Sequence, residues 1–164
     1  MIVAWNYIML KEVDNEEEAF REIRRFIDAN QLPAQTVRIE EGFTNSGLCF
    51  ASKRDRHRWK EDEKMFPCKQ VSVETTGIYW LPSFGSIYST DSLTFRIWYE
   101  NDRSKLQAVR EFRSKERFMK HHKLFGHYSK FELDDWRERY ELLYSMLENY
   151  LKDCAAEKEA QKCH

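Results

Sequence analysis

The sequence predicts an α+β domain: a predominantly antiparallel sheet of about five to six strands, with an N-terminal helix and two long C-terminal helices packed on it. Strand-like segments are bunched in mid-chain and joined by short turn-like links, which favours antiparallel pairing over a parallel βαβ fold. One helical segment precedes this group and two follow it. The 164 residues fit one domain, predicted over residues 1–154, with a frayed tail at residues 155–164.

The predicted strands are short segments that are rich in β-branched and aromatic residues or that alternate apolar with polar side chains. The clearest alternation spans residues 93–99, where Trp98 is expected on the opposite face of the sheet from Phe95 and Ile97. Gly42 is interpreted as a turn residue. The predicted strands are residues 2–10, 36–40, 48–51, 71–73, 78–81 and 93–99.

Three segments carry helical signals. Asp14 or Asn15 caps the first helix, which opens with three glutamates that are well placed against the helix dipole. The second helix is predicted over residues 102–123. The third begins at Ser129, which has capping-box spacing to Glu132, and one side of it is apolar and must be buried. This apolar stripe consists of Leu133, Trp136, Tyr140, Leu143, Leu147, Tyr150 and Cys154.

The formal net charge is -1, but the charge is unevenly spread along the chain. Residues 53–60 hold five lysines and arginines against Asp55, and residues 103–130 hold nine against Glu111 and Glu116. On the predicted second helix, the side chains of Arg110, Arg113, Arg117, Lys120 and His121 fall within one stripe about 100° wide. The sequence therefore contains two candidate basic surfaces.

These two islands favour a non-catalytic binding or accessory protein that engages an anionic partner, either nucleic acid or an acidic protein surface. Trp59 among the bases of the first island suits stacking on a nucleobase. The competing interpretation is a solvated face whose charges pair with each other, as Glu111 and Lys115 could on a helix. The predicted contact residues are Arg110, Arg113, Arg117, Lys120 and His121, together with Lys53, Arg54, Arg56, Arg58 and Trp59.

A second interpretation is a small-molecule-binding protein with an aromatic-lined cleft on the sheet. Alternating strands must point some aromatic side chains away from the main core, and Arg96 would lie beside Trp98. The competing interpretation is that these aromatics are buried in a core or a dimer. The predicted pocket residues are Trp5, Tyr79, Trp80, Phe84, Tyr88, Arg96 and Trp98.

No catalytic residue is predicted, because phosphate-loop and nucleophile motifs are absent from the sequence; an enzyme with an unrecognised site is the third interpretation. No metal or cofactor is predicted either. The four cysteines lack zinc-ligand spacing, and the adjacent His121 and His122 would point about 100° apart on a helix. With no apolar segment of the roughly 20 residues that span a bilayer, we expect a cytoplasmic protein without a membrane partner. A homodimer through the terminal helix or a sheet face is a further expectation.

Overall fold

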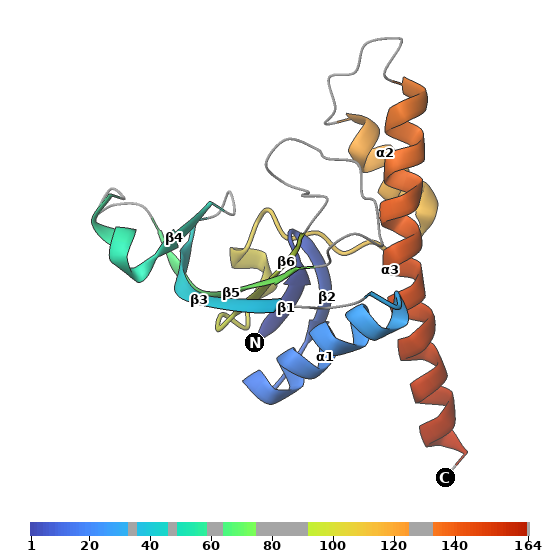
Figure 1. Ribbon diagram of the computed structural model, residues 1–164, viewed down its shortest axis with the longest axis horizontal. Helices are drawn as coiled ribbons and strands as arrows, with labels where there is room; N and C mark the ends of the chain where they lie inside the picture. The colour runs from blue at the N-terminus through green and yellow to red at the C-terminus, as the bar shows by residue number, and fades with distance from the viewer. Residues whose placement is uncertain (33–35, 46–48, 59–63, 75–91, 125–132, 164) are drawn as a thin grey trace.

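The computed structural model describes residues 1–32, 36–45, 49–58, 64–74, 92–124 and 133–163 (Figure 1). Its six-stranded antiparallel sheet, N-terminal helix and long C-terminal helix confirm the predicted α+β class. The strands are β1 (Ile2–Trp5), β2 (Ile8–Glu12), β3 (Thr36–Thr44), β4 (Phe50–Ser52), β5 (Phe66–Glu74) and β6 (Ser92–Trp98). The α-helices are α1 (Glu16–Ala29), α2 (Lys115–Leu124) and α3 (Leu133–Lys162), and the short 3-10 helices are η1 (Lys53–Arg58) and η2 (Arg103–Lys105).

The strand order in the sheet is β2-β1-β6-β5-β3-β4, and each neighbouring pair is antiparallel. The last strand along the chain, β6, therefore lies inside the sheet, where it joins the β1–β2 hairpin to the β5, β3 and β4 group. Figure 1 shows α1 passing below the sheet and α3 standing beside it as a long rod. The two outer strands of the sheet are β2 and β4.

Side chains from the two faces of the sheet form two separate cores. On one face, Trp5 and Phe95 pack around Phe26 of α1, with ring centroids 4.8 and 5.4 Å from the Phe26 ring. Tyr150 of α3 joins them, its ring centroid 5.9 Å from that of Phe26. On the opposite face, Trp98 is fully buried in a smaller cluster. The predicted direction of Trp98 is thus right, but its face of the sheet is covered.

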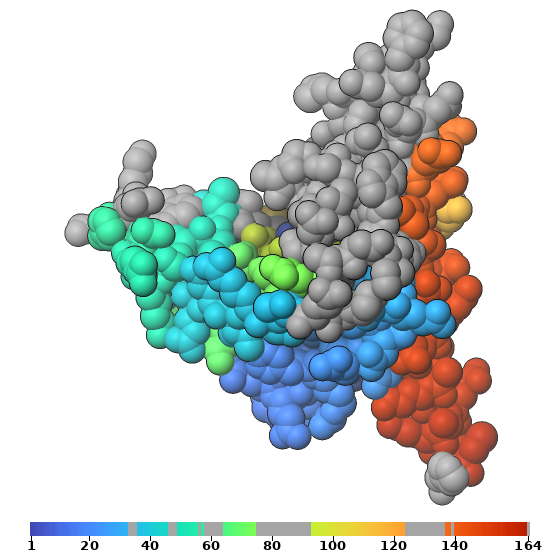
Figure 2. Space-filling view, viewed as in Figure 1, coloured from blue at the N-terminus to red at the C-terminus, as the bar shows by residue number. Residues whose placement is uncertain are grey.

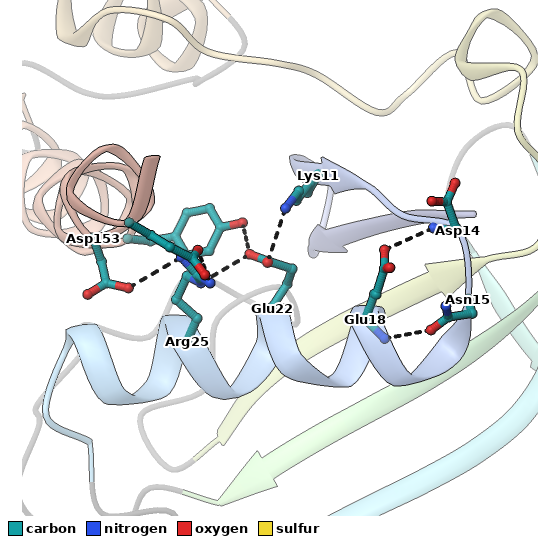
Figure 3. Close-up of polar contacts among 9 residues, drawn as sticks. Lys11, Asp14, Asn15, Glu18, Glu22, Arg25 and Asp153 are labelled. Carbon is teal, nitrogen blue, oxygen red and sulfur yellow. Dashed lines mark hydrogen bonds and ion pairs between the residues drawn. The ribbon is translucent and has the colours of Figure 1, made fainter. Parts of the chain in front are cut away.

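The start of α1 follows the sequence signal. Asn15 is the N-cap residue, and its side-chain oxygen accepts a hydrogen bond of 2.9 Å from the Glu18 backbone N–H (Figure 3). The Glu18 carboxylate in turn accepts a hydrogen bond of 3.2 Å from the Asp14 backbone N–H. Asn15 thus satisfies a backbone donor that the first turn of a helix would otherwise leave free, and Glu18 binds the N–H of the residue before the cap. The predicted cap at Asp14 or Asn15 is confirmed.

A charged network ties α1 to α3. Glu22 is buried, and its carboxylate accepts a hydrogen bond of 2.7 Å from the Tyr150 hydroxyl. Lys11 lies 3.4 Å and the Arg25 guanidinium 3.5 Å from the same carboxylate (Figure 3). Arg25 also reaches two carboxylates of α3. Because a buried carboxylate is costly without compensation, these contacts hold the two helices in one relative position.

The predicted helix over residues 102–123 is wrong in its first half. After η2 the chain makes a turn at residues 107–108, and Arg110 then forms a parallel bridge with Ile8 alongside β2. α2 begins only at Lys115, and the Ser114 hydroxyl and carbonyl accept hydrogen bonds from the backbone N–H groups of Arg117 and Phe118 in its first turn. The basic residues of this segment therefore come from two different backbone conformations.

The burial of the apolar residues explains why this helix is interrupted. Leu106 and Val109 are buried in the smaller core beside Trp98. Phe112 and Phe118 are buried in the main core, with ring centroids 5.1 Å apart. One straight helix cannot serve both faces of the sheet, so the chain unwinds between the two pairs. Tertiary packing overrides local helix propensity here.

Gly42 lies within β3, not at the turn that the sequence predicts. A Cβ atom at this position would lie 2.1 Å from the Ala51 carbonyl oxygen and 2.7 Å from the Phe50 ring, both in β4. Only a residue without a side chain allows β4 to approach this closely. The glycine therefore marks the pairing of β3 with β4, and β3 continues to Thr44.

α3 buries the predicted stripe where its side chains are described. Cys154 is partly buried, and the fully buried members are Tyr140, Leu143, Leu147 and Tyr150. Outside the described part lie the predicted capping residues Ser129 and Glu132 and the side chains of Leu133 and Trp136. The helix continues to Lys162, across residues for which the sequence predicts a frayed tail, and its side chains beyond Cys154 are exposed.

Thr44→Val is expected to lower the free energy of unfolding by about 1 kcal/mol. The Trp98 indole N–H donates a hydrogen bond of 2.8 Å to the Thr44 hydroxyl, and both residues are fully buried. Valine keeps the shape but removes this acceptor. Urea denaturation measures the change, with the exposed Thr36→Val as the matched control. Equal midpoints for Thr44→Val and wild type would show that this hydrogen bond does not stabilise the fold.

Candidate functional site

Three residues of the predicted basic stripe lie together on α2. Arg117, Lys120 and His121 stand at positions i, i+3 and i+4, so they share one flank of the helix. Phe118 and His122 occupy the neighbouring flank and are buried. Arg117 and Lys120 are exposed, and His121 is half-buried.

Arg110 reaches the same surface from the segment between η2 and α2. Its backbone N–H donates to the Tyr7 carbonyl, and its carbonyl accepts from the Met9 N–H, both at 2.8 Å. Burial lowers the pKa of His121, and the nearby positive charge of Arg110 lowers it further. Arg110 is therefore close to the flank of α2 that carries His121. We call the set Arg110, Arg117, Lys120 and His121 the basic surface.

The cations of the basic surface are not neutralised by described carboxylates, and the Arg110 guanidinium donates hydrogen bonds to the backbone carbonyls of Gln107 and Val109. Within the described part of the chain, no carboxylate forms an ion pair with Arg110, Arg117 or Lys120. Arg113 differs, because its guanidinium lies 3.7 Å from Glu111. The predicted stripe of five residues thus becomes a cluster of four, with Arg113 drawn towards a carboxylate.

A shallow groove extends the basic surface towards η2. It has a volume of about 420 Å³, and its lining includes the guanidinium-bearing Arg103 and Arg110 together with Gln107. Its lining also includes Leu106 and Val109, which belong to the smaller core. Arg103 is paired with a carboxylate, that of Glu111, at 2.8 Å. An extended anionic ligand could pass from this groove onto α2.

A buried tyrosine–histidine pair supports the basic surface from below. The Nδ1 atom of His122 lies 2.7 Å from the Phe118 carbonyl, so it carries the proton, and Nε2 accepts a hydrogen bond from the Tyr7 hydroxyl. Burial lowers the pKa of His122 to about 4, so its imidazole is neutral at physiological pH. No local sequence pattern indicates this pair, although the spacing of Phe118 and His122 places both on one flank of a helix.

The first basic island lies elsewhere. Lys53 of η1 pairs with Glu41 at 2.7 Å, and Arg54 is exposed. The side chains of Arg56 and Arg58 and the whole of Trp59 lie outside the described residues. Since η1 follows β4 and Arg110 runs beside β2, the islands flank opposite edges of the sheet (Figure 1). Five strand spacings of about 4.8 Å, or about 24 Å, separate these edges.

The predicted pocket residues do not come together as a cleft where they are described. Trp5 and Trp98 are fully buried on opposite faces of the sheet, one in each core. Arg96 is half-buried, and its guanidinium makes a 3.4 Å hydrogen bond to the Gln70 side chain. Burial lowers the pKa of Arg96. The remaining predicted pocket residues, Tyr79, Trp80, Phe84 and Tyr88, lie outside the described part.

Other kinds of site receive no support from the residues that the structure describes. Among them, no three His, Cys, Asp or Glu side chains are grouped to hold a metal ion. Burial raises the pKa of the Cys68 thiol to about 12, so this thiol is a core group and not a nucleophile. None of the described helices is long and apolar enough to cross a membrane. No known protein family, curated protein or solved structure matches the chain.

Proposed function

We propose that the protein binds a nucleic-acid strand through the basic surface, with Arg110, Arg117 and Lys120 contacting phosphates. One observation carries this proposal: all three cations are exposed, Arg117 and Lys120 share the flank of α2 that carries His121, and no described carboxylate forms an ion pair with them. Arginine and lysine in this state are the groups that bind a phosphate backbone, and their binding releases counterions. The neutral His121 beside them leaves room for a base or sugar without adding charge.

Among the described residues, the basic surface itself has no exposed large apolar side chain, which favours nucleic acid over an acidic protein as the partner. A protein interface usually has a desolvated apolar centre that supplies most of its affinity. The exposed large apolar residues among those described are Val37, Ile39, Tyr99 and Leu151, and none of them belongs to the basic surface. Phosphate contacts need no apolar centre, because the electrostatic contribution suffices.

Binding of a labelled single-stranded oligonucleotide is expected to weaken steeply with salt. Three phosphate contacts on a single strand predict a slope near -2.1, or about a 20-fold loss of affinity between about 50 and 200 mM salt. The double variant Arg117→Glu/Lys120→Glu should bind at least about tenfold more weakly at low salt, with a smaller slope. Fluorescence anisotropy measures both, and thermal unfolding confirms that the variant is folded.

The matched control reverses the same number of charges at the opposite edge of the sheet, as Lys53→Glu/Arg54→Glu on η1. This control is expected to bind like the wild type. Equal losses in the two double variants would overturn the assignment to the basic surface. Affinity for polyglutamate without affinity for the oligonucleotide would instead assign the surface to an acidic protein.

A further inference from the structure

One edge of the sheet is only partly paired. β3 pairs with β5 along its whole length, whereas β4 pairs with β3 only at Gly42, Phe43 and Thr44. The outer side of residues 36–41 therefore has no partner among the strands that the structure describes. Backbone N–H and C=O groups on such an edge are a template for a further strand.

The side chains of this edge are unusually exposed for apolar residues. Val37 and Ile39 are each 50% exposed, although they pair with the buried Val73 and Val71 of β5. They therefore extend the apolar face of the sheet past the part that the helices cover. Figure 2 shows the atoms of β3, in cyan, at the surface of the molecule. Added sheet at this edge would bury them.

We propose that a second copy of this chain pairs with this edge, antiparallel and about a two-fold axis at Ile39. In this register Arg38 of each copy lies directly opposite Glu40 of the other, so two opposite-charge pairs form on one face. On the other face Ile39 lies opposite its own copy. The two six-stranded sheets then form one continuous sheet.

The charges select this register over its neighbours. Moving the axis to residue 38 would place two Arg38 side chains opposite each other, and moving it to residue 40 would do the same with Glu40. Directly opposed like charges destabilise a strand pair. Placing the axis midway between two residues, such as 38 and 39, would put the apolar side chains of one copy on the polar face of the other. Charged side chains usually prevent an edge strand from pairing with another chain. Here the charges of Arg38 and Glu40 in one copy are complementary to those in a second copy.

The two charged residues are also available. Within the described part of the chain, neither Arg38 nor Glu40 forms an ion pair, whereas the next carboxylate, that of Glu41, pairs with Lys53 and Lys69. The terminal helix is a weaker candidate for self-association, because its stripe is buried within the chain and Leu151 alone among its large apolar residues is markedly exposed in the described part. The edge of β3 thus combines exposed apolar side chains, backbone donors and matched charges.

Charge exchange tests the proposal. Wild-type protein is expected to form dimers whose fraction rises with concentration in sedimentation-velocity ultracentrifugation. Arg38→Glu alone, or Glu40→Arg alone, turns both opposite-charge pairs into like-charge pairs and should raise the dimer dissociation constant about tenfold or more. The double exchange Arg38→Glu/Glu40→Arg restores both pairs and should restore the dimer. A wild-type monomer at every concentration, or a double variant as weak as the single ones, would overturn the proposal.

Cysteine cross-linking tests the register directly. Ile39→Cys places two thiols opposite each other across the axis, at a separation that a disulfide can bridge, and mild oxidation should give a covalent dimer. Val37→Cys is the matched control, since its thiol would lie opposite Glu41 and four residues from its own copy. Wild type oxidised in parallel accounts for the exposed Cys49 and Cys163. Equal cross-linking of the two variants would refute the register. The basic surface lies at the other edge of the sheet, so this result is independent of oligonucleotide binding.

Discussion

Replacement of Arg25 by methionine is expected to lower the free energy of unfolding by about 3 kcal/mol. The guanidinium lies among three carboxylates: Glu22 of α1 at 3.5 Å, Asp153 of α3 at 3.7 Å, and Glu157 of α3. Glu22 is buried, so loss of this cation leaves a desolvated charge whose remaining cation, Lys11, is half exposed. Repulsion among the three carboxylates adds to the cost. Methionine retains the length and apolar stem of the side chain, so the charge is the main change.

Two further variants separate charge from packing. Arg24→Met changes an exposed neighbour on the same helix and is expected to alter stability by less than about 0.5 kcal/mol. In the Arg25→Met background, Glu22→Gln removes the uncompensated charge and should recover part of the loss, which a double-mutant cycle quantifies. If Arg25→Met and Arg24→Met had the same urea midpoint, the network would carry no net stability.

The protein is expected to lose about 2 kcal/mol of unfolding free energy between about pH 7.5 and pH 5 because of His122. Burial lowers the pKa of this imidazole from 6.5 to about 4 in the folded state. As the pH falls through 6.5, the unfolded chain takes up a proton that the folded protein does not. Stability is therefore complete above this range and is lost progressively until the pH reaches about 4.

The variant His122→Gln isolates this contribution, because glutamine can replace both hydrogen bonds but does not titrate. The test does not depend on the unfolding free energy of this variant at neutral pH. The predicted result is that its unfolding free energy changes less with pH than that of the wild type. His121→Gln is the comparison, since that neighbouring imidazole is only half-buried. Lysine hydrogen bonds lower the pKa values of Glu16 and Glu41, so these carboxylates stay ionised above about pH 5. A His122→Gln profile parallel to that of the wild type would contradict the prediction.

The elements that follow from the sequence are those fixed by neighbouring residues. The cap at Asn15 uses groups three residues apart, and the alternation over residues 93–99 places Phe95 and Trp98 on opposite faces, as observed. The complete burial of Trp98 could not be predicted from this alternation. Alternation reveals which face a side chain occupies, but only the rest of the chain decides whether that face is covered, here by Leu106 and Val109.

The sequence predicts most of the basic surface, but from a single helix over residues 102–123 that begins only at Lys115 in the structure. Arg117, Lys120 and His121 share a helical flank, as their spacing indicates. Arg110 joins them because its backbone bridges to Ile8, more than a hundred residues away in the sequence, and no local pattern reports such a contact. The environment of His122 also depends on residues far away in the sequence. Burial keeps its imidazole neutral, and the Tyr7 hydroxyl that it binds lies more than a hundred residues away along the chain.

The position of β6 has a consequence for how the molecule assembles. The hairpin of β1 and β2 and the three-stranded group of β3, β4 and β5 each form from residues close in sequence, yet the two share no direct ladder. Only β6, pairing with β1 on one side and β5 on the other, makes them one sheet. Closing that contact spans more than ninety residues, so its loop entropy is expected to set the folding rate. Until β6 is in place, the edges of β1 and β5 that it pairs with are exposed and can pair with strands of other chains.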